Sequence, residues 1–369
     1  MPRTCRRTRE RWRCALASPY LRVDLRGGSA YGAPQLDVPV RLNTNENPFP
    51  PPAEVMESVA EAVGAAHLNR YPDREASEMR AALAGYAGHV PEGTWAANGS
   101  NEVLQQICQA FGGPGACAMT FEPSYAMHPL IARVTGMRTV SVPRRSEDFS
   151  VDLPAALAAI QSREPAIVFV TSPNNPTGNA TSAEVVAELC AAATGVVVVD
   201  EAYREFGSST SQGLLEERAN LIITRTMSKA FALAGVRVGY CLTSEELVED
   251  LHLVRLPYHL SALTQAAAVA ALSHAEACLA QVAVLIGERD RVIGALGAMG
   301  VEVLPSEANF FCFAILRPPA ETWRALLDKG VLVRDVSGWG DLGRFLRACV
   351  GTPEENDAFL VAMKEVLDA

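Results

Sequence analysis

The sequence predicts an α/β protein whose large domain has a mostly parallel sheet between helices and whose smaller domain is α+β. Three short apolar runs rich in β-branched residues indicate the sheet, at positions 167–170, 196–199 and 221–223. Helix-like segments separate them, and this order is typical of a parallel sheet covered on both faces. After about residue 265 the pattern changes to a long helical stretch, 264–298, and then to the strand-like NFFCFAIL. This change predicts the second, smaller domain.

Two helices of the large domain follow from the spacing of their apolar residues. In TWAANGSNEVLQQICQAFGGPG a short strand and a Gly-Ser-Asn turn precede a helix, which Gly112 and Gly113 end. Its inward face is predicted to consist of Val103, Leu104, Ile107, Cys108 and Phe111. Thr181 and Ser182 can cap the next helix. The inward face of that helix is predicted to consist of Val185, Val186, Leu189 and Cys190.

The chain is divided by composition into four segments. Residues 1–18 are a basic extension, with six arginines against one glutamate up to Pro19, and are expected to be disordered. Residues 19–50 form an N-terminal arm that we expect to join the small domain, and the proline-rich NPFPPPAE marks its end. The large domain is predicted to span 51–265 and the small C-terminal domain 266–369.

Composition argues against several classes of function. The net charge of −10 disfavours a nucleic-acid partner, because phosphate binding needs a basic face. No apolar run approaches the roughly 20 residues that cross a bilayer. Nine cysteines without a CxxC pair are interpreted as reduced core residues of a cytoplasmic protein, and six scattered histidines form no metal-binding pattern. No metal site is predicted.

Polar side chains follow each of the three buried strands. Asn175 follows the first, Asp200 and Tyr203 the second, and Lys229 the third, where it stands among small and apolar residues. Open parallel sheets bind ligands at the carboxyl ends of their strands, so these four side chains should share one crevice. Ser100 and Asn101 begin a predicted helix, where free N–H groups and the helix dipole favour a phosphate.

One ligand suits this whole set, namely pyridoxal 5'-phosphate (PLP). Lys229 would form the Schiff base, and Asp200 would keep the ring nitrogen protonated so that the ring withdraws electrons. Asn175 and Tyr203 would bind the ring oxygen. Taken singly, each feature has an ordinary structural explanation: a snorkelling lysine, a helix cap at Asp200 and a turn at Asn-Asn-Pro-Thr-Gly. Their occurrence together, in order and at strand ends, favours the cofactor site.

The sequence resembles the fold-type I PLP-dependent aminotransferases over nearly all of the chain after residue 20. SPNNPTG, VVDEAYREF and TRTMSKAFALAGVRVGY carry the resemblance to the superfamily. LNTNENPFP, NRYPD, AANGSNE, EPSYAMH and RLPYHLSALTQAA narrow it to the histidinol-phosphate aminotransferases. Within that family the resemblance makes Lys229 also the acid and base of the proton shift.

The resemblance implies further site residues. Tyr125 would stack on the cofactor ring, and Tyr71 would reach the cofactor of the partner subunit in a homodimer with a shared active site. Side chains that would hold the cofactor phosphate are Ser100, Asn101, Thr226, Ser228 and Arg237. Arg334 and Arg347, thirteen positions apart, would bind the anionic groups of the substrates, together with Tyr31 of the arm.

The function expected from this resemblance is amino-group transfer between L-histidinol phosphate and 2-oxoglutarate in histidine biosynthesis. The partners would then be a small-molecule amino donor and a 2-oxo acid. RACVGT, with Ala-Cys where the family has β-branched residues, and the Gly- and Trp-containing VSGWGDLGRF leave the substrate open. Alternatives on the same scaffold are an aromatic amino-acid aminotransferase and a phosphothreonine decarboxylase. A non-catalytic PLP-binding regulator is disfavoured, because every cofactor residue is present.

Overall fold

A computed structural model describes residues 18–26 and 32–369. The chain divides into two compact units, one up to Gly32 and the other from Ala33 to Ala369, and each is described by itself. The described part of the first unit contains a 3-10 helix, η1 (Val23–Leu25), beside an ion pair between Arg22 and Asp24. The predicted basic extension lies outside the described residues except for Ser18, and so does Tyr31.

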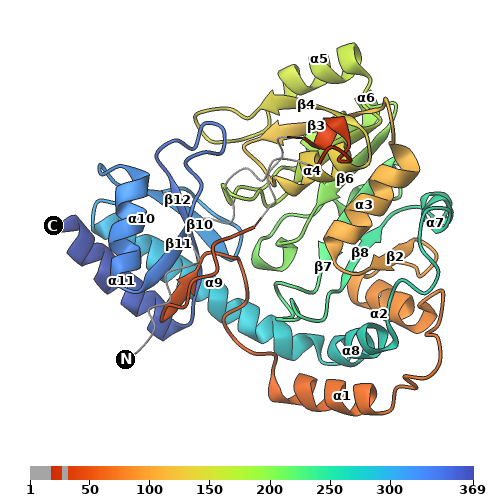
Figure 1. Ribbon diagram of the computed structural model, residues 1–369, viewed down its shortest axis with the longest axis horizontal. Coiled ribbons are helices and arrows are strands. Elements are labelled where there is room, and N and C mark those ends of the chain that lie inside the picture. The colour runs from red at the N-terminus through yellow and green to blue at the C-terminus, as the bar shows by residue number, and fades with distance from the viewer. Residues whose placement is uncertain (1–17, 27–31) are drawn as a thin grey trace. The chain divides into compact units, whose positions relative to one another are not determined.

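A seven-stranded sheet in the order β2-β8-β7-β6-β5-β3-β4 forms the centre of the second unit (Figure 1). Neighbouring strands from β7 to β4 are parallel, whereas β8 pairs antiparallel with β2 and β7. The prediction of a mostly parallel sheet is therefore confirmed. Its strands are β2 (Thr94–Ala97), β3 (Cys117–Glu122), β4 (Arg138–Pro143), β5 (Ile167–Thr171), β6 (Val196–Asp200), β7 (Leu221–Thr226) and β8 (Gly239–Leu242).

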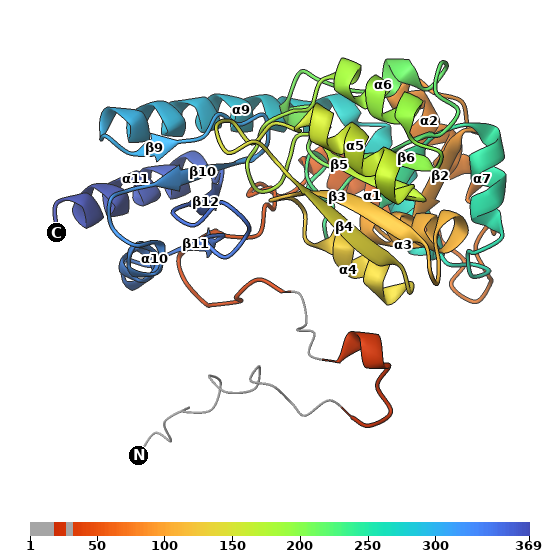
Figure 2. The ribbon, with the colours of Figure 1, turned by 90° about the horizontal axis from the view of Figure 1, so that it is seen from above.

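Helices cover this sheet on both faces. Along β6, Val197 and Val199 belong to one buried cluster, whereas Val196 and Val198 belong to another. Successive side chains of a strand point to opposite faces, so the two clusters are the two sides of the sheet. Figure 2 shows helices α5 and α6 on one side and α3 and α4 on the other. The helices packed around the sheet are α1 (Ala53–Gly64), α2 (Ser77–Ala87), α3 (Ser100–Phe111), α4 (Met127–Val134), α5 (Leu153–Arg163), α6 (Ala183–Ala192) and α7 (Glu245–His252).

The two helices predicted from apolar spacing are present. Helix α3 begins at Ser100 and ends before Gly112, with four of its five predicted inward residues fully buried and Phe111 half-buried. Helix α6 is capped by Ser182, whose hydroxyl accepts a hydrogen bond from the Val185 N–H at 3.5 Å. The Thr181 N–H instead donates a hydrogen bond to the Ser172 hydroxyl oxygen at 2.9 Å.

The prediction of one long helical stretch over 264–298 is wrong in one respect. The chain forms two helices there, α8 (Ala262–Leu272) and α9 (Ala275–Ala298), which meet at an angle of 75°. Among the described residues no single helix has the length and apolarity to cross a membrane, and only this bent pair, taken together, meets that test by length and composition.

A five-stranded sheet in the order β1-β11-β12-β10-β9 completes the unit. Helix α9 packs against β9 and β10 of this sheet and extends towards the large sheet (Figure 1). Strand β1 comes from the arm and pairs in parallel with β11. The strands are β1 (Val40–Leu42), β9 (Glu302–Val303), β10 (Phe310–Ala314), β11 (Val331–Asp335) and β12 (Leu346–Cys349), and the helices beside them are α10 (Pro319–Asp328) and α11 (Pro353–Leu367). The domain limits predicted at residues 50 and 265 stay predictions.

Candidate active site

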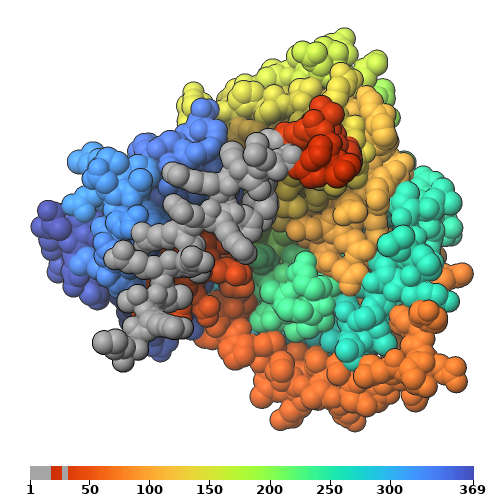
Figure 3. All heavy atoms as spheres, viewed as in Figure 1, coloured from red at the N-terminus to blue at the C-terminus, as the bar shows by residue number. Residues whose placement is uncertain are grey.

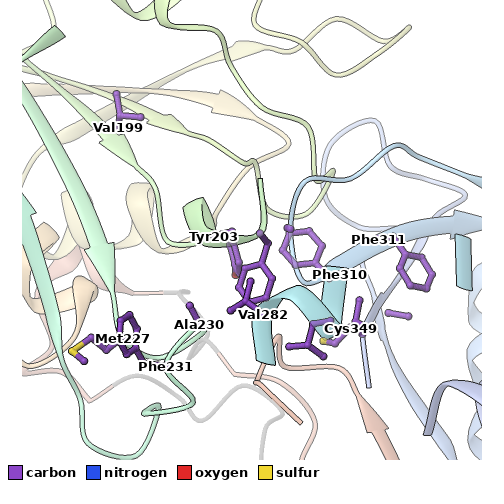
Figure 4. Close-up of a cluster of buried hydrophobic side chains, with 14 of the residues drawn as sticks. Val199, Tyr203, Met227, Ala230, Phe231, Val282, Phe310, Phe311 and Cys349 are labelled. Carbon is purple, nitrogen blue, oxygen red and sulfur yellow. The ribbon is translucent and has the colours of Figure 1, made fainter. Parts of the chain in front are cut away.

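The carboxyl ends of β5, β6 and β7 meet at one edge of the large sheet. In the parallel register Thr171 pairs with Asp200, and Asp200 pairs with Thr224. Beyond these ends the amide of Asn175 donates to the Tyr203 hydroxyl oxygen at 3.4 Å. Tyr203 also packs edge-on against Phe310 of β10, with ring centroids 5.0 Å apart (Figure 4). The predicted site residues of the large sheet thus lie against the smaller sheet.

Lys229 is one of only three lysines in the chain. The other two, Lys329 and Lys364, are exposed, and Lys329 pairs with Glu365. Lys229 follows β7 and is half-buried. Burial lowers the pKa of its amine to about 8, with Arg347 and Arg237 acting in the same direction and Cys349 and Glu46 opposing them. A substantial fraction of this amine is therefore neutral near pH 8 and available as a nucleophile.

Asp200 is a buried carboxylate at the end of β6, with 2% of its surface exposed. Its Oδ2 lies 3.1 Å from the Nε2 of His128, and its Oδ1 accepts from the Ala202 N–H at 3.2 Å. The His128 ring stacks on Phe169 with centroids 4.7 Å apart. His128 was not identified as a site residue from sequence. It ends the motif EPSYAMH, but nothing in that motif indicates contact with Asp200, 72 positions away. Its contact with Asp200 fixes the orientation of this carboxylate.

The beginning of α3 forms a compact cradle suited to an anion. Gly99 precedes the helix with φ of 85° and without a capping side chain, so the first N–H groups keep their donor capacity. A Cβ on Gly99 would lie 2.2 Å from the Arg237 Nη2, and one on Gly239 would lie 2.0 Å from the Ser100 nitrogen. Only glycine fits at either position, which brings the arginine and β8 directly against the helix start.

Hydroxyl groups complete this cradle. Arg237 donates through Nη1 to the Ser228 hydroxyl at 3.3 Å, and the Ser228 N–H donates to the Thr226 hydroxyl at 3.1 Å. On the other side the Tyr125 hydroxyl donates to Asn101 Oδ1 at 3.1 Å. A helix N-terminus, a guanidinium and hydroxyls around one point make a strong binding site for a phosphate.

Arg334 and Arg347 lie directly opposite each other on the antiparallel strands β11 and β12. Opposed residues point to the same face, so two cationic side chains project side by side. Arg347 is buried and donates to Asn175 Oδ1 at 2.6 Å and to the Asn43 carbonyl oxygen at 3.0 Å. Its Nε–H has no protein partner among the described residues. Arg334 lies over the Trp339 ring, 5.8 Å from its centroid.

Tyr71 lies apart from these residues on the molecular surface. It is 79% exposed and stacks on Tyr258, with ring centroids 4.4 Å apart. In Figure 3 the segment from α1 to α2 that contains it, in orange, forms one rim of the surface. Three large apolar side chains from the segments 65–76 and 253–261 are also exposed: Leu68, Leu253 and Leu256.

The arm supplies a site residue that sequence reasoning missed. Asn45, just after β1, donates its amide N–H to the Tyr203 hydroxyl oxygen at 3.0 Å. Cys349 of β12 lies beside it, with Sγ 3.1 Å from Asn45 Oδ1. Asn45 stands in the motif LNTNENPFP, but the tyrosine it contacts is 158 positions away. No local pattern predicts such a contact.

Comparisons with known proteins agree with this site. The family model for aminotransferases of class I and II matches residues 38–363. A curated histidinol-phosphate aminotransferase of Thermobifida fusca is 54% identical over 93% of this chain and 94% of its own length. One of Corynebacterium diphtheriae is 52% identical over 94% of this chain and 96% of its own length.

Solved structures give the same result for the fold. The histidinol-phosphate aminotransferase of Sinorhizobium meliloti, determined in complex with pyridoxal-5'-phosphate, superposes with a TM-score of 0.81 and 28% identity, covering 90% of this chain and 91% of that one. The expected fold-type I architecture and the resemblance stated from the motifs are both confirmed. The chain is an enzyme that belongs to the class I and II aminotransferase family.

Proposed function

We propose that this enzyme transfers an amino group between L-histidinol phosphate and 2-oxoglutarate, with PLP bound at Lys229. The observation that carries the cofactor assignment is a lysine amine whose pKa is lowered by burial and by Arg347 and Arg237, the last of which lies at the phosphate cradle. This lysine follows β7, the strand paired with the β6 strand that ends in the buried Asp200. The substrate assignment is supported by curated relatives with more than half of their residues identical, which are named histidinol-phosphate aminotransferases.

The residues present fit PLP. The cradle at α3 suits its phosphate, with Ser100, Asn101 and Arg237 around it. Asp200 has acceptor capacity left beyond His128 and Ala202 for a protonated ring nitrogen. When bound, PLP supplies a carbonyl carbon for an amine and a ring that withdraws the electron pair left when the substrate loses its Cα proton.

The protein's own side chains would transfer the proton and hold the cofactor in place. Lys229 in its neutral form takes the proton from the substrate Cα, which is general-base catalysis by a desolvated amine. Asp200, which is oriented by His128, would bind the ring nitrogen. Tyr203 and Asn175 bind the ring oxygen, and Tyr125 covers the ring. Ser228 and Thr226 hold the phosphate with Arg237.

The opposed arginines are proposed to bind the anionic ends of both substrates. Like charges directly opposite on neighbouring strands destabilise a sheet, and an anion between them removes that cost. After its two hydrogen bonds, Arg347 retains donors for a carboxylate or phosphate, including its Nε–H. Arg334 is placed by the strand register to bind the same group. Tyr31 is proposed to join them, although it lies outside the described residues.

We further propose a cytoplasmic homodimer with a shared active site. Tyr71 is too exposed to serve its own chain's cradle, and exposed leucines from the same surface accompany it. An exposed apolar group of this kind favours a symmetric contact with a second copy. In that dimer the Tyr71 hydroxyl would reach the partner's cofactor phosphate.

Loading of the apoenzyme with PLP should depend on pH through Lys229. Because its pKa is about 8, the reactive neutral amine increases about tenfold per pH unit below that value and levels off above it. The rate constant of cofactor capture, followed by absorbance after mixing, should therefore reach a plateau above pH 8. A rate that is still rising tenfold per unit between pH 9 and 10 would contradict the lowered pKa.

Gly239→Ala should weaken PLP binding by at least about tenfold, because its Cβ would displace the start of α3 from the cradle. Absorbance titration of the apoenzyme measures the dissociation constant. Gly294→Ala is the matched control, since its Cβ would meet nothing within 4 Å on the exposed side of α9. Equal affinities for the two variants would show that the cradle does not bind the phosphate.

Substrate choice is tested with three amines on the PLP-loaded protein. We expect kcat/KM for L-histidinol phosphate to exceed that for L-phenylalanine by about 10³-fold or more, since the phosphate gains a charge-assisted pair with arginine. Preference for phenylalanine would move the assignment to aromatic aminotransferases. Release of carbon dioxide from O-phospho-L-threonine would move it to the decarboxylase alternative.

A further inference from the structure

A network of four polar side chains from three segments, namely the arm, the turn after β5 and strand β12, ends at the hydroxyl oxygen of Tyr203. Asn45 of the arm donates to it at 3.0 Å and Asn175 at 3.4 Å. Asn175 in turn accepts from Arg347 at 2.6 Å through its Oδ1. Cys349, two positions after Arg347 on β12, contacts both the backbone and the side chain of Asn45. All of these residues except Arg347 are uncharged, and all are buried.

The direction of these hydrogen bonds determines where the Tyr203 proton can go. An amide NH₂ group can only donate, so the phenol oxygen is the acceptor in both contacts. The single hydroxyl proton of Tyr203 is thus not used by either amide. It remains available to a third group. Bonds accepted by a hydroxyl also strengthen the bond that it donates.

Cys349 fixes which end of the Asn45 amide faces Tyr203. Its sulfur accepts from the backbone N–H of Asn45 at 2.8 Å, and its S–H donates to the side-chain Oδ1 of Asn45 at 3.1 Å. Burial raises the pKa of the Cys349 thiol, so the group keeps the proton that it donates. If the amide were reversed, the S–H would lose its acceptor, and Oδ1 would face Tyr203 and take the phenol proton. The observed orientation gives the Cys349 S–H an acceptor and leaves the Tyr203 hydroxyl proton unused by Asn45.

The backbone at Asn45 supports the same arrangement. Asn45 has a φ of 52°, in the left-handed region that asparagine adopts more readily than most residues. Its carbonyl oxygen accepts from the Asn309 amide at 3.3 Å, which ties the turn to the start of β10. Two contacts with Cys349 and one with Asn309 thereby hold Asn45 beside Tyr203.

We propose that Asn45 is a positioning residue that directs the Tyr203 hydroxyl proton toward the ring oxygen of the cofactor, and that Cys349 sets the orientation of the Asn45 amide. The inference rests on the proposed PLP site. It assigns a role in tuning the cofactor to the N-terminal arm, which also supplies the edge strand of the small sheet.

The test is the pH midpoint of the absorbance change of the bound cofactor. A hydrogen bond from Tyr203 to the anionic ring oxygen would stabilise its negative charge. It would thereby lower the proton affinity of the nearby nitrogen through which Lys229 would hold the cofactor. Asn45→Gly keeps the left-handed backbone and removes the amide, so the midpoint should rise by about 0.5–1 pH unit. In a Tyr203→Phe background the same substitution should cause no further rise, because the group through which it acts is absent.

Two comparisons separate this role from a general effect on folding. Glu164→Gly is the matched control, since Glu164 also has a positive φ, of 44°, but lies exposed at the end of α5. Its midpoint should equal that of the wild type. Cys349→Ser keeps a donor and an acceptor and should retain the wild-type midpoint, whereas Cys349→Ala should raise it in the same direction as Asn45→Gly.

Each outcome bears on one claim. An unchanged midpoint in Asn45→Gly overturns the inference while leaving the proposed function intact. So does an equal rise with and without the Tyr203 hydroxyl, because the effect would then bypass the phenol. A wild-type protein with no cofactor absorbance after addition of PLP overturns the proposed function and this inference with it.

Discussion

Lys229→Arg is expected to lower turnover by at least about 10⁴-fold while leaving the fold intact. Arginine keeps a positive charge and much of the side-chain length, but its guanidinium is protonated at every accessible pH and cannot act as nucleophile or base. The other two lysines are exposed and cannot substitute for the missing amine. Single-turnover measurements with L-histidinol phosphate and added PLP give the rate of the proton-transfer step directly.

Lys329→Arg is the matched control for this substitution. Lys329 pairs with Glu365 on the surface, and an arginine can keep that pair, so turnover should be unchanged. If Lys229→Arg retained more than about a tenth of the wild-type rate, the lysine would not be the general base that we propose.

Asp200→Asn should lower kcat by about 10³-fold with a smaller effect on cofactor affinity. The substitution keeps the size of the side chain and one acceptor oxygen for the Ala202 N–H, but it removes the negative charge that would hold the ring nitrogen protonated. The ring then withdraws electrons poorly, and the loss appears in the proton-transfer step. Stopped-flow absorbance with L-histidinol phosphate separates that step from binding.

Asp328→Asn controls for the loss of one negative charge, since Asp328 is exposed at the end of α10. It should leave kcat within about twofold of wild type, as expected of a surface substitution. A kcat for Asp200→Asn equal to that of this control would mean that the buried carboxylate has no part in activating the cofactor.

The architecture was predictable because its signals are local. The apolar runs that became β5, β6 and β7 are short and bounded by polar residues, and a buried parallel strand needs little else to be recognised. The break between α8 and α9 was missed for the converse reason. Alanine-rich sequence on both sides of Ser273 and His274 continues the helical pattern, and tertiary packing, which periodicity does not report, turns the chain there.

The site was predictable where it follows from strand ends and not where it depends on packing between the sheets. Lys229 and Asp200 could be named because Asp200 ends one buried strand and Lys229 stands three residues after the end of the next. Asn45 and Cys349 lie 304 positions apart, and their contact exists only because β1 joins the small sheet. His128 was overlooked because it lies in α4, whereas its partner Asp200 lies at the end of β6, 72 positions further along the chain.

Reduction of the PLP-loaded enzyme with borohydride, followed by peptide mass spectrometry, tests the central claim most directly. Borohydride makes the bond between PLP and a lysine amine permanent, and the chain offers only Lys229, Lys329 and Lys364. The account predicts one pyridoxyl group per chain, on the peptide that contains Lys229. A label on either exposed lysine, or no label on a protein that retains its cofactor, would contradict the assignment of Lys229 and the site built around it.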